Sequence, residues 1–281
     1  MRRNRRLCCL FVVLLFPLCV HAQTATPSPT PRPPSLEKQF FKNILHDQAA
    51  IWTAPTKLDK SDAKWMIPAG IGTMALITTD RITGDEVAEA DRLKTPSRIL
   101  SYPGSYYGIA AVAGSFYFIG RSRGDSRARE TGILTAEASL NSLIVEGTLK
   151  GISQRARPAD GIERSEFLDG GTSFPSGHST QAWAVATVIA NEYHDRRLVQ
   201  VAAYGIASAV SVARFTGGKH YLSDVLVGSA LGFGIGKYVY NAHHRDPLDL
   251  TQEQHSPQWP AITANVNRRT HQYGIGLTWS F

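Results

Sequence analysis

The chain has 281 residues, of which 43% are hydrophobic and 19% are charged, with 30 Lys and Arg against 23 Asp and Glu. This composition is too apolar for a wholly disordered chain, and it shows neither a collagen-like glycine period nor a cysteine-dense scaffold. The length is enough for one or two domains with a sizeable core.

The first 22 residues have the pattern of a secretory signal peptide. Four arginines within residues 1–6 precede an apolar stretch over 7–20, and the Val-His-Ala of 20–22 resembles a small-x-small cleavage site. Because that stretch is shorter than the roughly 20 residues that cross a bilayer, we expect cleavage after Ala22 rather than an uncleaved anchor helix. Cleavage removes four arginines and all three cysteines and leaves 26 basic against 23 acidic side chains. The remaining net charge of +3 gives little support for a nucleic-acid partner, and we expect none.

Residues 23–35 are rich in Pro, Thr and Ser and predict an extended linker. Apolar residues at helical spacing from Leu36 to Trp52 then predict an amphipathic helix that Pro55 ends. Six Ala- and Gly-rich apolar segments follow, each too long for a strand: 65–79, 106–120, 133–149, 179–193, 198–213 and 222–240. The sequence therefore predicts an all-α domain over 36–245, a bundle of about six core helices. We expect the charged stretch from Arg121 to Glu130 to be a solvated loop rather than an anion site.

Residues 246–281 differ in character from the helical domain. They begin with a polar connection, and residues 273–281 then alternate apolar with small or polar residues, a period typical of a strand. Residues 261–266 could pair with this strand through a turn at 267–270. The alternation resembles the closing strand of an outer-membrane barrel, but two strands cannot close a barrel. We therefore expect a short C-terminal β-hairpin that packs on the helical domain.

Three clusters carry residues suited to phosphate chemistry. The first contains Lys150 and Arg157, the second is Pro-Ser-Gly-His at 175–178, and the third contains Arg214, His220 and Asp224. Three cations are enough to offset a phosphate dianion, and guanidinium groups match phosphate oxygens in a bidentate way. Each cluster alone is a modest signal, but together they predict a site for phosphoryl transfer.

The remaining residues of these clusters suggest how the reaction proceeds. Ser176 offers a hydroxyl, and Gly177 offers backbone N–H groups at a helix N-terminus, where anions are favoured. His220 and Asp224 are four residues apart, so in a helix the carboxylate would lie beside the imidazole and fix its tautomer. We expect His220 to be the nucleophile and His178 the general acid for the leaving oxygen. The cations are protein side chains, so the chemistry requires no metal and we expect no cofactor.

The three clusters resemble the three motifs of the type 2 phosphatidic acid phosphatase (PAP2)/vanadium haloperoxidase superfamily. The family patterns are Lys-x6-Arg-Pro, Pro-Ser-Gly-His and Ser-Arg-x5-His-x3-Asp, and here they read KGISQRARP, PSGH and ARFTGGKHYLSD. The motifs cover 150–224, and the helical pattern extends the resemblance to roughly 36–245. Ala213 stands where the family usually has Ser, which removes one hydroxyl donor. The resemblance implies that His220 forms a phosphohistidine supported by Asp224, that His178 is the acid, and that six residues bind phosphate: Lys150, Arg157, Ser176, Gly177, His178 and Arg214.

The resemblance implies a metal-independent phosphatase that acts on lipid phosphates, such as phosphatidate or a polyprenyl diphosphate, or on small phosphate esters. One alternative is a vanadate-dependent haloperoxidase, in which vanadate takes the place of phosphate at the same residues. A second is a non-catalytic envelope scaffold protein, although the intact set of site residues argues against it. The sequence gives no indication of the oligomeric state.

The family contains both six-span membrane enzymes and soluble secreted ones. The signal peptide favours a periplasmic or secreted protein. Glu137, Glu146 and Gln200 lie within apolar segments, where polar groups are costly in lipid. If the apolar segments crossed a membrane after cleavage of the leader, the arginine-rich stretch at 121–129 would lie outside the cytoplasm. That placement is against the positive-inside rule. The alternative is a multi-pass inner-membrane protein, and association with a membrane surface remains open.

Overall fold

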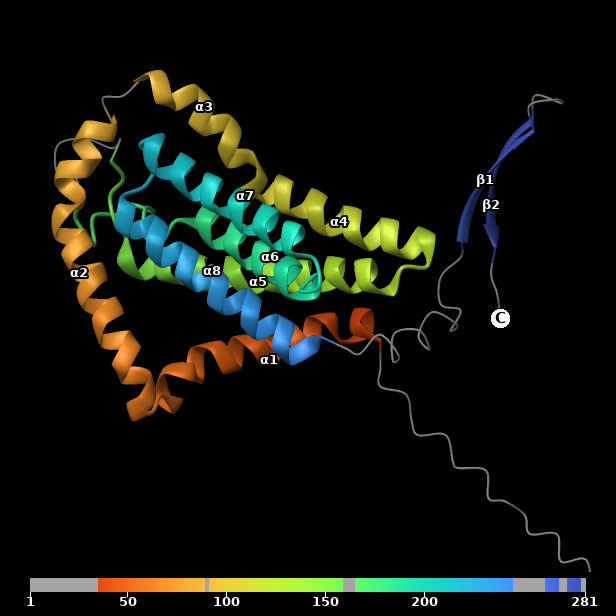
Figure 1. Ribbon diagram of the computed structural model, residues 1–281, viewed down its shortest axis with the longest axis horizontal. Helices are drawn as coiled ribbons and strands as arrows, with labels where there is room; N and C mark the ends of the chain where they lie inside the picture. Colours follow the sequence, from red (N-terminus) through yellow and green to blue (C-terminus); the bar gives the residue numbers. More distant parts are fainter. Residues whose placement is uncertain (1–34, 89–90, 159–164, 245–260, 268–271, 279–281) are drawn as a thin grey trace, which may run out of the picture. The chain divides into compact units, whose positions relative to one another are not determined.

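The structure is a computed structural model that describes residues 35–88, 91–158, 165–244, 261–267 and 272–278 (Figure 1). The expected signal peptide and nearly all of the linker lie outside these residues. In the described part of the chain the helical domain contains eight α-helices and no strand, which confirms the all-α prediction. The amphipathic helix expected at 36–52 and the six apolar segments account for seven of the eight, and the eighth is a short helix at 91–101.

Each predicted helical segment falls in an α-helix, and only residue 193 of the segment 179–193 lies just beyond its helix end. The helices are α1 (Leu36–Thr53), α2 (Lys60–Ala88), α3 (Asp91–Ser101), α4 (Tyr106–Arg123), α5 (Ser126–Ser153), α6 (Gly177–Glu192), α7 (Arg197–Thr216) and α8 (Leu222–His243). Two 3₁₀ turns, η1 (Ala54–Lys57) and η2 (Tyr102–Gly104), follow α1 and α3. The sequence did not predict α3, because this helix is polar and contains Pro96, a residue that normally marks a helix end.

The charged stretch at 121–130 is not a loop, contrary to the expectation. Gly124 ends α4 in the left-handed conformation, with φ at +67°, and Asp125 at once caps α5 by accepting a hydrogen bond from the Ala128 N–H at 3.0 Å. A glycine C-cap followed directly by an aspartate N-cap turns the chain with two residues outside the helices. The arginines of this stretch therefore lie on the facing ends of α4 and α5.

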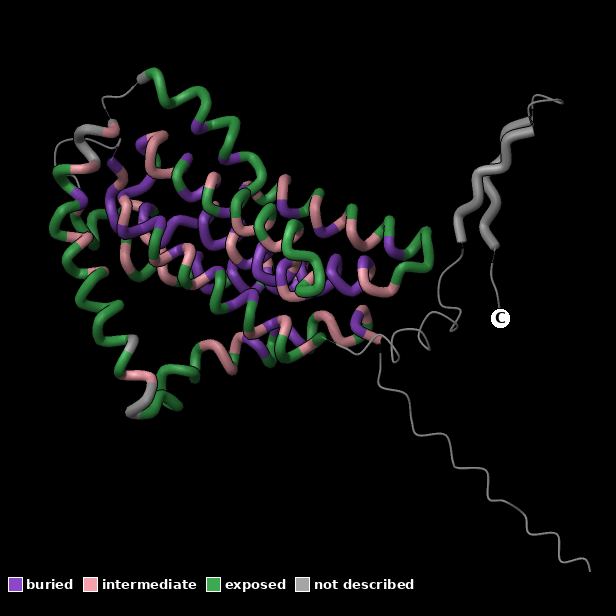
Figure 2. The backbone as a smooth tube through the Cα atoms, in the orientation of Figure 1, coloured by how far each residue is buried: buried purple, intermediate pink, exposed green. Residues whose placement is uncertain are grey.

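The hydrophobic core lies where α5, α6 and α8 pack together. Its largest cluster is made of small and branched residues: Leu134, Ala138 and Val145 from α5, Ala184 and Val188 from α6, and Ile235 and Val239 from α8. Glycines allow α8 to lie directly on α6, since a Cβ at Gly232 would be 2.2 Å from the Thr180 carbonyl oxygen. In Figure 2 the buried backbone is concentrated in these central helices.

Helix α2 lies outside this core. Figure 1 shows it crossing the end of the bundle where α5 ends and α6 and α8 begin. Most of its residues from 66 to 79 are exposed, but Asp80 is fully buried. Because an unpaired buried carboxylate would be strongly unfavourable, Asp80 must have partners in the bundle.

Two strands, β1 (Ala261–Asn267) and β2 (Gln272–Thr278), pair antiparallel. Ala261 lies opposite Thr278 and Asn267 opposite Gln272. The packing of this hairpin on the helices lies outside what the structure describes and stays a prediction.

The acidic residues within the third apolar segment face the interior. Glu137 accepts a hydrogen bond from the Asn43 amide at 2.9 Å, and Glu146 accepts one from the Tyr106 hydroxyl at 3.0 Å. Both carboxylates are buried, so they are no argument against lipid contact on the outside of α5. Among the described helices, α7 is long and apolar enough to cross a membrane.

Candidate active site

The structure brings all eight predicted site residues to one end of the bundle. Lys150 lies in the last turn of α5, and Arg157 follows that helix. The remaining residues are Ser176 as the N-cap of α6, Gly177 and His178 as its first residues, Arg214 in the last turn of α7, His220 in the following loop, and Asp224 in the first turn of α8. Four helix ends and two loops therefore converge there.

Gly177 is in direct contact with the last turns of α5. A Cβ at this position would lie 2.7 Å from Lys150 Nζ and 2.6 Å from Glu146 Oε2. Lys150 Nζ in turn lies 3.8 Å from Glu146 Oε1. The absence of a side chain at 177 therefore allows an ammonium group to approach the N-terminus of α6, where an anion is favoured.

The three cations of the site destabilise one another in the absence of an anion. Burial and the neighbouring Arg157 lower the pKa of Arg214 to about 10. Burial also lowers the pKa of Lys150, although Glu146 opposes this effect. Within the described residues no carboxylate pairs with Arg214, whose Nε is buried without a hydrogen-bond partner. A bound phosphate dianion would offset this repulsion.

The tautomer of His220 follows from its hydrogen bond to a backbone carbonyl. Its Nδ1 lies 2.8 Å from the Ser173 carbonyl oxygen, which can accept but not donate, so Nδ1 carries the proton. The lone pair is then on Nε2, the nitrogen that a nucleophilic imidazole requires. His220 is 3% exposed, and burial lowers its pKa to about 4, so the ring is neutral near pH 7.

Asp224 does not hold His220 in the way that the sequence suggested. Its Oδ2 is 3.7 Å from His220 Nδ1, beyond hydrogen-bond distance, because His220 lies before α8 rather than within it. The carboxylate instead accepts hydrogen bonds from the Tyr221 N–H at 3.0 Å and the Ser173 hydroxyl at 2.5 Å. Asp224 thus caps α8 and fixes the segment whose carbonyl orients His220, and its charge remains close enough to favour an imidazolium.

The environment of His178 favours its neutral form, so this acid would gain its proton only when the substrate is bound. Burial lowers its pKa to about 3, and the next causes are Arg214, the neighbouring ring of His220, Lys150 and Arg157. A phosphate dianion would reverse the sign of the local potential and raise this pKa. The proton would then be available at the moment when a leaving oxygen requires it.

Sequence reasoning missed Arg155, a fully buried guanidinium in the middle of the first motif. Its Nη1 lies 2.6 Å from Asp224 Oδ1, and its Nη2 lies 2.9 Å from Asp80 Oδ2. Its guanidinium also lies 4.8 Å from the ring centre of Phe167 and 4.4 Å from that of Tyr221. Arg155 therefore joins α2 to the base of the site through two carboxylates and two aromatic rings.

Some signal for this network was present in the sequence. Asp80 is a lone acid directly after an apolar segment, and such a residue inside a helical domain usually has a buried partner. The partner could not be predicted, because Arg155 is one of several arginines and its burial depends on tertiary packing. Glu146 was seen only as an unfavourable charge, although it lies beside Lys150 and Gly177.

We expect Gly177→Ala to lower activity without loss of the fold. The added Cβ meets the flexible ends of Lys150 and Glu146, which can move, but Lys150 then leaves its position. A displacement of about 1 Å in a catalytic group can reduce turnover roughly 100-fold. Steady-state kinetics should show the lower activity, and thermal melting should show that the fold is retained. Gly151→Ala is the matched control, since a Cβ there meets no atom within 4 Å, and equal kinetics of the two variants would contradict the account.

Acid should destabilise the folded protein through the two site histidines. An unfolded histidine binds a proton below about pH 6.5, whereas His220 and His178 stay neutral down to about 4 and about 3. The unfolded state thus binds more protons in this window, and stability is lost as the pH falls through it. His178→Gln should therefore show a smaller drop in Tm between about pH 7 and about pH 4.5 than the wild type. His46→Gln, a change at an exposed histidine, is the control, and identical drops in all three proteins would refute the prediction.

The sequence model of the PAP2 superfamily matches residues 131–247, a stretch that contains all eight predicted site residues. The lipid A 1-phosphatase of Porphyromonas gingivalis is 41% identical over 90 residues, which is 29% of this chain and 20% of that protein. A PA-phosphatase related-family protein of Dictyostelium discoideum is 33% identical over 98 residues, which is 30% of this chain and 36% of that protein. The chain thus spans from a fifth to about a third of the length of these relatives.

Two crystal structures are also similar. A transmembrane PAP2 type phosphatidylglycerolphosphate phosphatase from Bacillus subtilis aligns with 73% of this chain and 94% of its own, at 20% identity and a TM-score of 0.46. LpxE from Aquifex aeolicus aligns with 56% of this chain and 92% of its own, at 22% identity and a TM-score of 0.44. The part of the chain that matches the PAP2 superfamily, residues 131–247, carries all three motifs.

Proposed function

We propose that the chain is a metal-independent phosphatase that hydrolyses phosphate monoesters, with lipid phosphates as its main substrates, through a phosphohistidine on His220. The observation that carries this proposal is the tautomer of His220, because the Ser173 carbonyl leaves the lone pair on Nε2 of a ring that lies near the cations Arg214 and Arg157. The names of the two matched relatives, a lipid A 1-phosphatase and a PA-phosphatase related protein, support the lipid class.

In the first step Nε2 of His220 attacks phosphorus, and the bond from phosphorus to the ester oxygen breaks. His178 gives its proton to that oxygen, so the leaving group departs as a neutral alcohol. The positive charge that develops on His220 is stabilised by the carboxylate of Asp224, 3.7 Å from Nδ1. Lys150, Arg157 and Arg214 hold the equatorial oxygens of the transferring group.

In the second step a water molecule attacks the phosphohistidine. The neutral imidazole of His178 takes a proton from the water, and the bond from phosphorus to nitrogen breaks. Inorganic phosphate leaves, and His220 returns to its neutral form. Both histidines therefore regain their starting protonation, and the cycle consumes one water molecule per ester.

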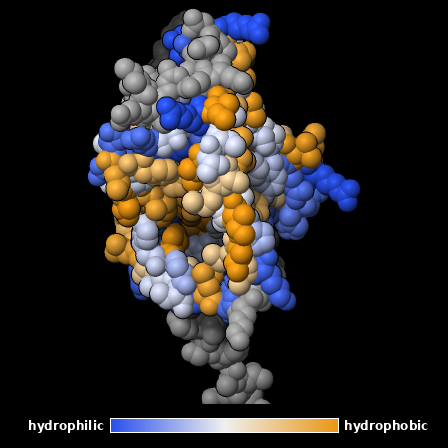
Figure 3. Space-filling model, turned by 90° about the vertical axis from the view of Figure 1, so that its left-hand side faces the viewer, coloured by the Kyte–Doolittle hydropathy of each residue, from blue (hydrophilic) through white to orange (hydrophobic). Residues whose placement is uncertain are grey.

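We propose that residues 36–245 form the phosphatase domain, after a signal peptide at 1–22 and a linker at 23–35, with 246–281 as an appended segment. We place the domain outside the cytoplasm, in the periplasm or at a membrane surface. The exposed apolar side chains of α2, including Ile67, Ile71 and Met74, support contact with lipid. Figure 3 shows apolar residues around a hollow on the face where α2 lies. Release of the protein by an alkaline carbonate wash would support this placement, and retention in the pellet would favour a multi-pass arrangement instead.

The test of the function is phosphate release by purified protein in the presence of EDTA. The substrates would be p-nitrophenyl phosphate, a short-chain phosphatidate and a polyprenyl phosphate, each assayed with and without detergent. Turnover in EDTA with faster release from the lipid phosphates is the expected result. Activity that disappears with EDTA and returns with a divalent metal would overturn the metal-independent mechanism.

A further inference from the structure

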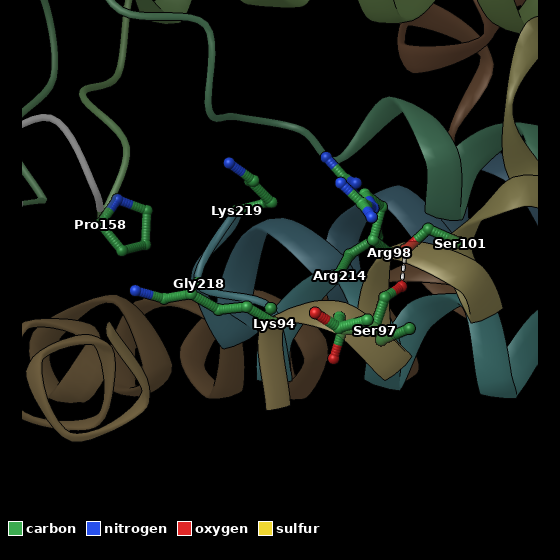
Figure 4. Close-up of a pocket in the computed structure, with 11 residues that line it drawn as sticks. Lys94, Ser97, Arg98, Ser101, Pro158, Arg214, Gly218 and Lys219 are labelled. Atoms are coloured by element: carbon green, nitrogen blue, oxygen red, sulfur yellow. Dashed lines mark hydrogen bonds between the residues drawn. The ribbon is translucent and has the colours of Figure 1, made fainter. Parts of the chain in front are cut away.

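The two ends of the helical bundle carry different charged groups. A cavity of about 500 Å³ beside Arg214, to which α3 contributes Arg98, belongs to the end that carries the proposed phosphate site (Figure 4). The opposite end, away from α2 in Figure 1, carries the start of α5 and the ends of α6 and α8. Glu130 at that end is 20 residues before Lys150 on α5, which is about 30 Å along the helix axis. The groups there therefore take no part in the proposed phosphate chemistry.

Three side chains from three different helices converge at this opposite end. Glu130 lies in the second turn of α5, Glu192 is the last residue of α6, and His244 directly follows α8. Nδ1 of His244 lies 3.2 Å from Glu130 Oε1 and 3.2 Å from Glu192 Oε2. One oxygen or nitrogen of each residue lies within 4.8 Å of those of the other two. The glutamate side chains are 0% and 3% exposed and the imidazole is 30% exposed, so the cluster is buried on one side and open on the other.

The contacts of His244 differ from those of an ordinary buried ion pair. The neighbouring His243 shows the ordinary pattern, since its Nε2 lies 2.8 Å from Oδ1 of Asp47. His244 instead has two equal and longer contacts, and Glu192 Oε2 is buried yet accepts no hydrogen bond within the described residues. An imidazole carries at most one proton at Nδ1, and this proton can point at only one of the two oxygens. A cation between the three atoms would satisfy both carboxylates at once.

The distances are close to those between two ligands of a tetrahedral metal ion. Zinc binds histidine nitrogen and carboxylate oxygen at about 2.0–2.2 Å, so two such ligands lie about 3.3–3.6 Å apart. Both contacts of His244 Nδ1, at 3.2 Å, nearly equal this separation. A nitrogen ligand favours a transition metal over calcium or magnesium, which take oxygen ligands. Two carboxylates and a neutral imidazole would also balance the charge of a divalent ion.

The surroundings hold the three side chains in place. Arg127 Nε donates a hydrogen bond to the Glu192 carbonyl oxygen at 3.0 Å and lies 4.0 Å from Glu192 Oε1. The same arginine also donates to Asp195 at 3.3 Å, so Glu192 shares this cation with a second acid. The His244 ring stacks on Tyr240, with the ring centres 4.6 Å apart and the planes 18° from parallel. Contacts of this kind orient the ligands of a metal ion before it binds.

We propose that Glu130, Glu192 and His244 form a binding site for a divalent transition-metal ion such as zinc. The three side chains supply three ligands, and the open side next to His244 leaves the fourth position to water. The ion ties the start of α5 to the ends of α6 and α8, segments that are far apart in the sequence. It therefore stabilises the fold and has no role in phosphate release.

The experiment measures zinc binding and thermal melting of the full chain after treatment with EDTA and removal of the chelator. Zinc at about 100 times its Kd should raise the Tm of the wild type by roughly 5–10 °C. His244→Gln changes an exposed residue, so the protein should fold, bind one zinc ion fewer by calorimetry and lose this shift. Glu192→Gln, which keeps the shape of the side chain, should lose the shift as well. His194→Gln is the matched control, at an exposed histidine two residues beyond Glu192, and should behave as the wild type.

X-ray absorption at the zinc edge identifies the ligands of the bound ion. The site should give nitrogen and oxygen ligands at about 2.0–2.2 Å, whereas the cysteines within residues 1–22 would give sulfur at about 2.3 Å. Equal zinc binding and equal Tm shifts in the wild type and the His244→Gln protein would overturn the proposal, as would the absence of zinc binding in both. In either case His244 is an ordinary ion-pair partner of the two glutamates. These readouts are independent of phosphatase activity, so they test the metal site whatever the outcome of the phosphate-release assay.

Discussion

His220→Ala should lower the rate of phosphate release by roughly 10⁴-fold or more, because the change removes the nucleophile and leaves only binding and charge stabilisation. The buried imidazole fills a small polar space next to Ser173, so we expect the fold to persist. Phosphate release from p-nitrophenyl phosphate, with circular dichroism and melting as checks on folding, measures the effect.

The control for this change is His194→Ala, at an exposed histidine beyond α6. Asp224→Asn should reduce activity less than loss of His220, since Asp224 acts on the charge and position of the imidazole rather than on phosphorus. A His220→Ala protein with activity near that of the wild type would exclude the phosphohistidine mechanism.

Arg155→Met should destabilise the protein by about 3–5 kcal/mol, the usual cost of removing one partner from a buried ion pair. Asp80 and Asp224 would both be left buried without their shared cation. Activity should fall as well, because Asp224 loses the contact that holds it at the start of α8. Chemical unfolding of the two proteins gives the difference in free energy.

Arg157→Met is the matched control, two residues away in the same motif. This side chain is partly exposed, and its described hydrogen bond is to the Thr172 hydroxyl at 3.1 Å. Its loss should reduce activity while stability changes by less than about 1 kcal/mol. Equal stability of the Arg155→Met and wild-type proteins would show that the network does not support the fold.

Much of the helical domain could be predicted from the sequence, because its helices are long apolar segments separated by breaks. The exception was α3, whose polar sequence and Pro96 hide a helix that is held in place by α7. The charged stretch around Gly124 was wrongly predicted to be a loop. A glycine C-cap followed by an aspartate N-cap joins the two helices through these two residues alone.

The motifs located the proposed site, but its supporting contacts could not be read from spacing. The four-residue separation of His220 and Asp224 suggested a helical pair, whereas Asp224 caps α8 and leaves His220 outside the helix. Arg155 and Glu146 each depend on burial against segments far apart in the chain, which no local pattern reports. The cavity beside Arg214 was likewise hidden, because α3 contributes Arg98 to it.

The most direct test of the central claim is the detection of phosphate bound to His220 during turnover. The His178→Ala protein would be mixed with radiolabelled p-nitrophenyl phosphate and quenched in alkali, where phosphohistidine is stable. This leaving group needs no proton from an acid, whereas the attack of water still needs His178 as a base, so the intermediate should accumulate. The account predicts label on the peptide that contains His220, stable in alkali and lost in acid. Label on another residue, or phosphate release with no labelled protein at any time, would contradict it.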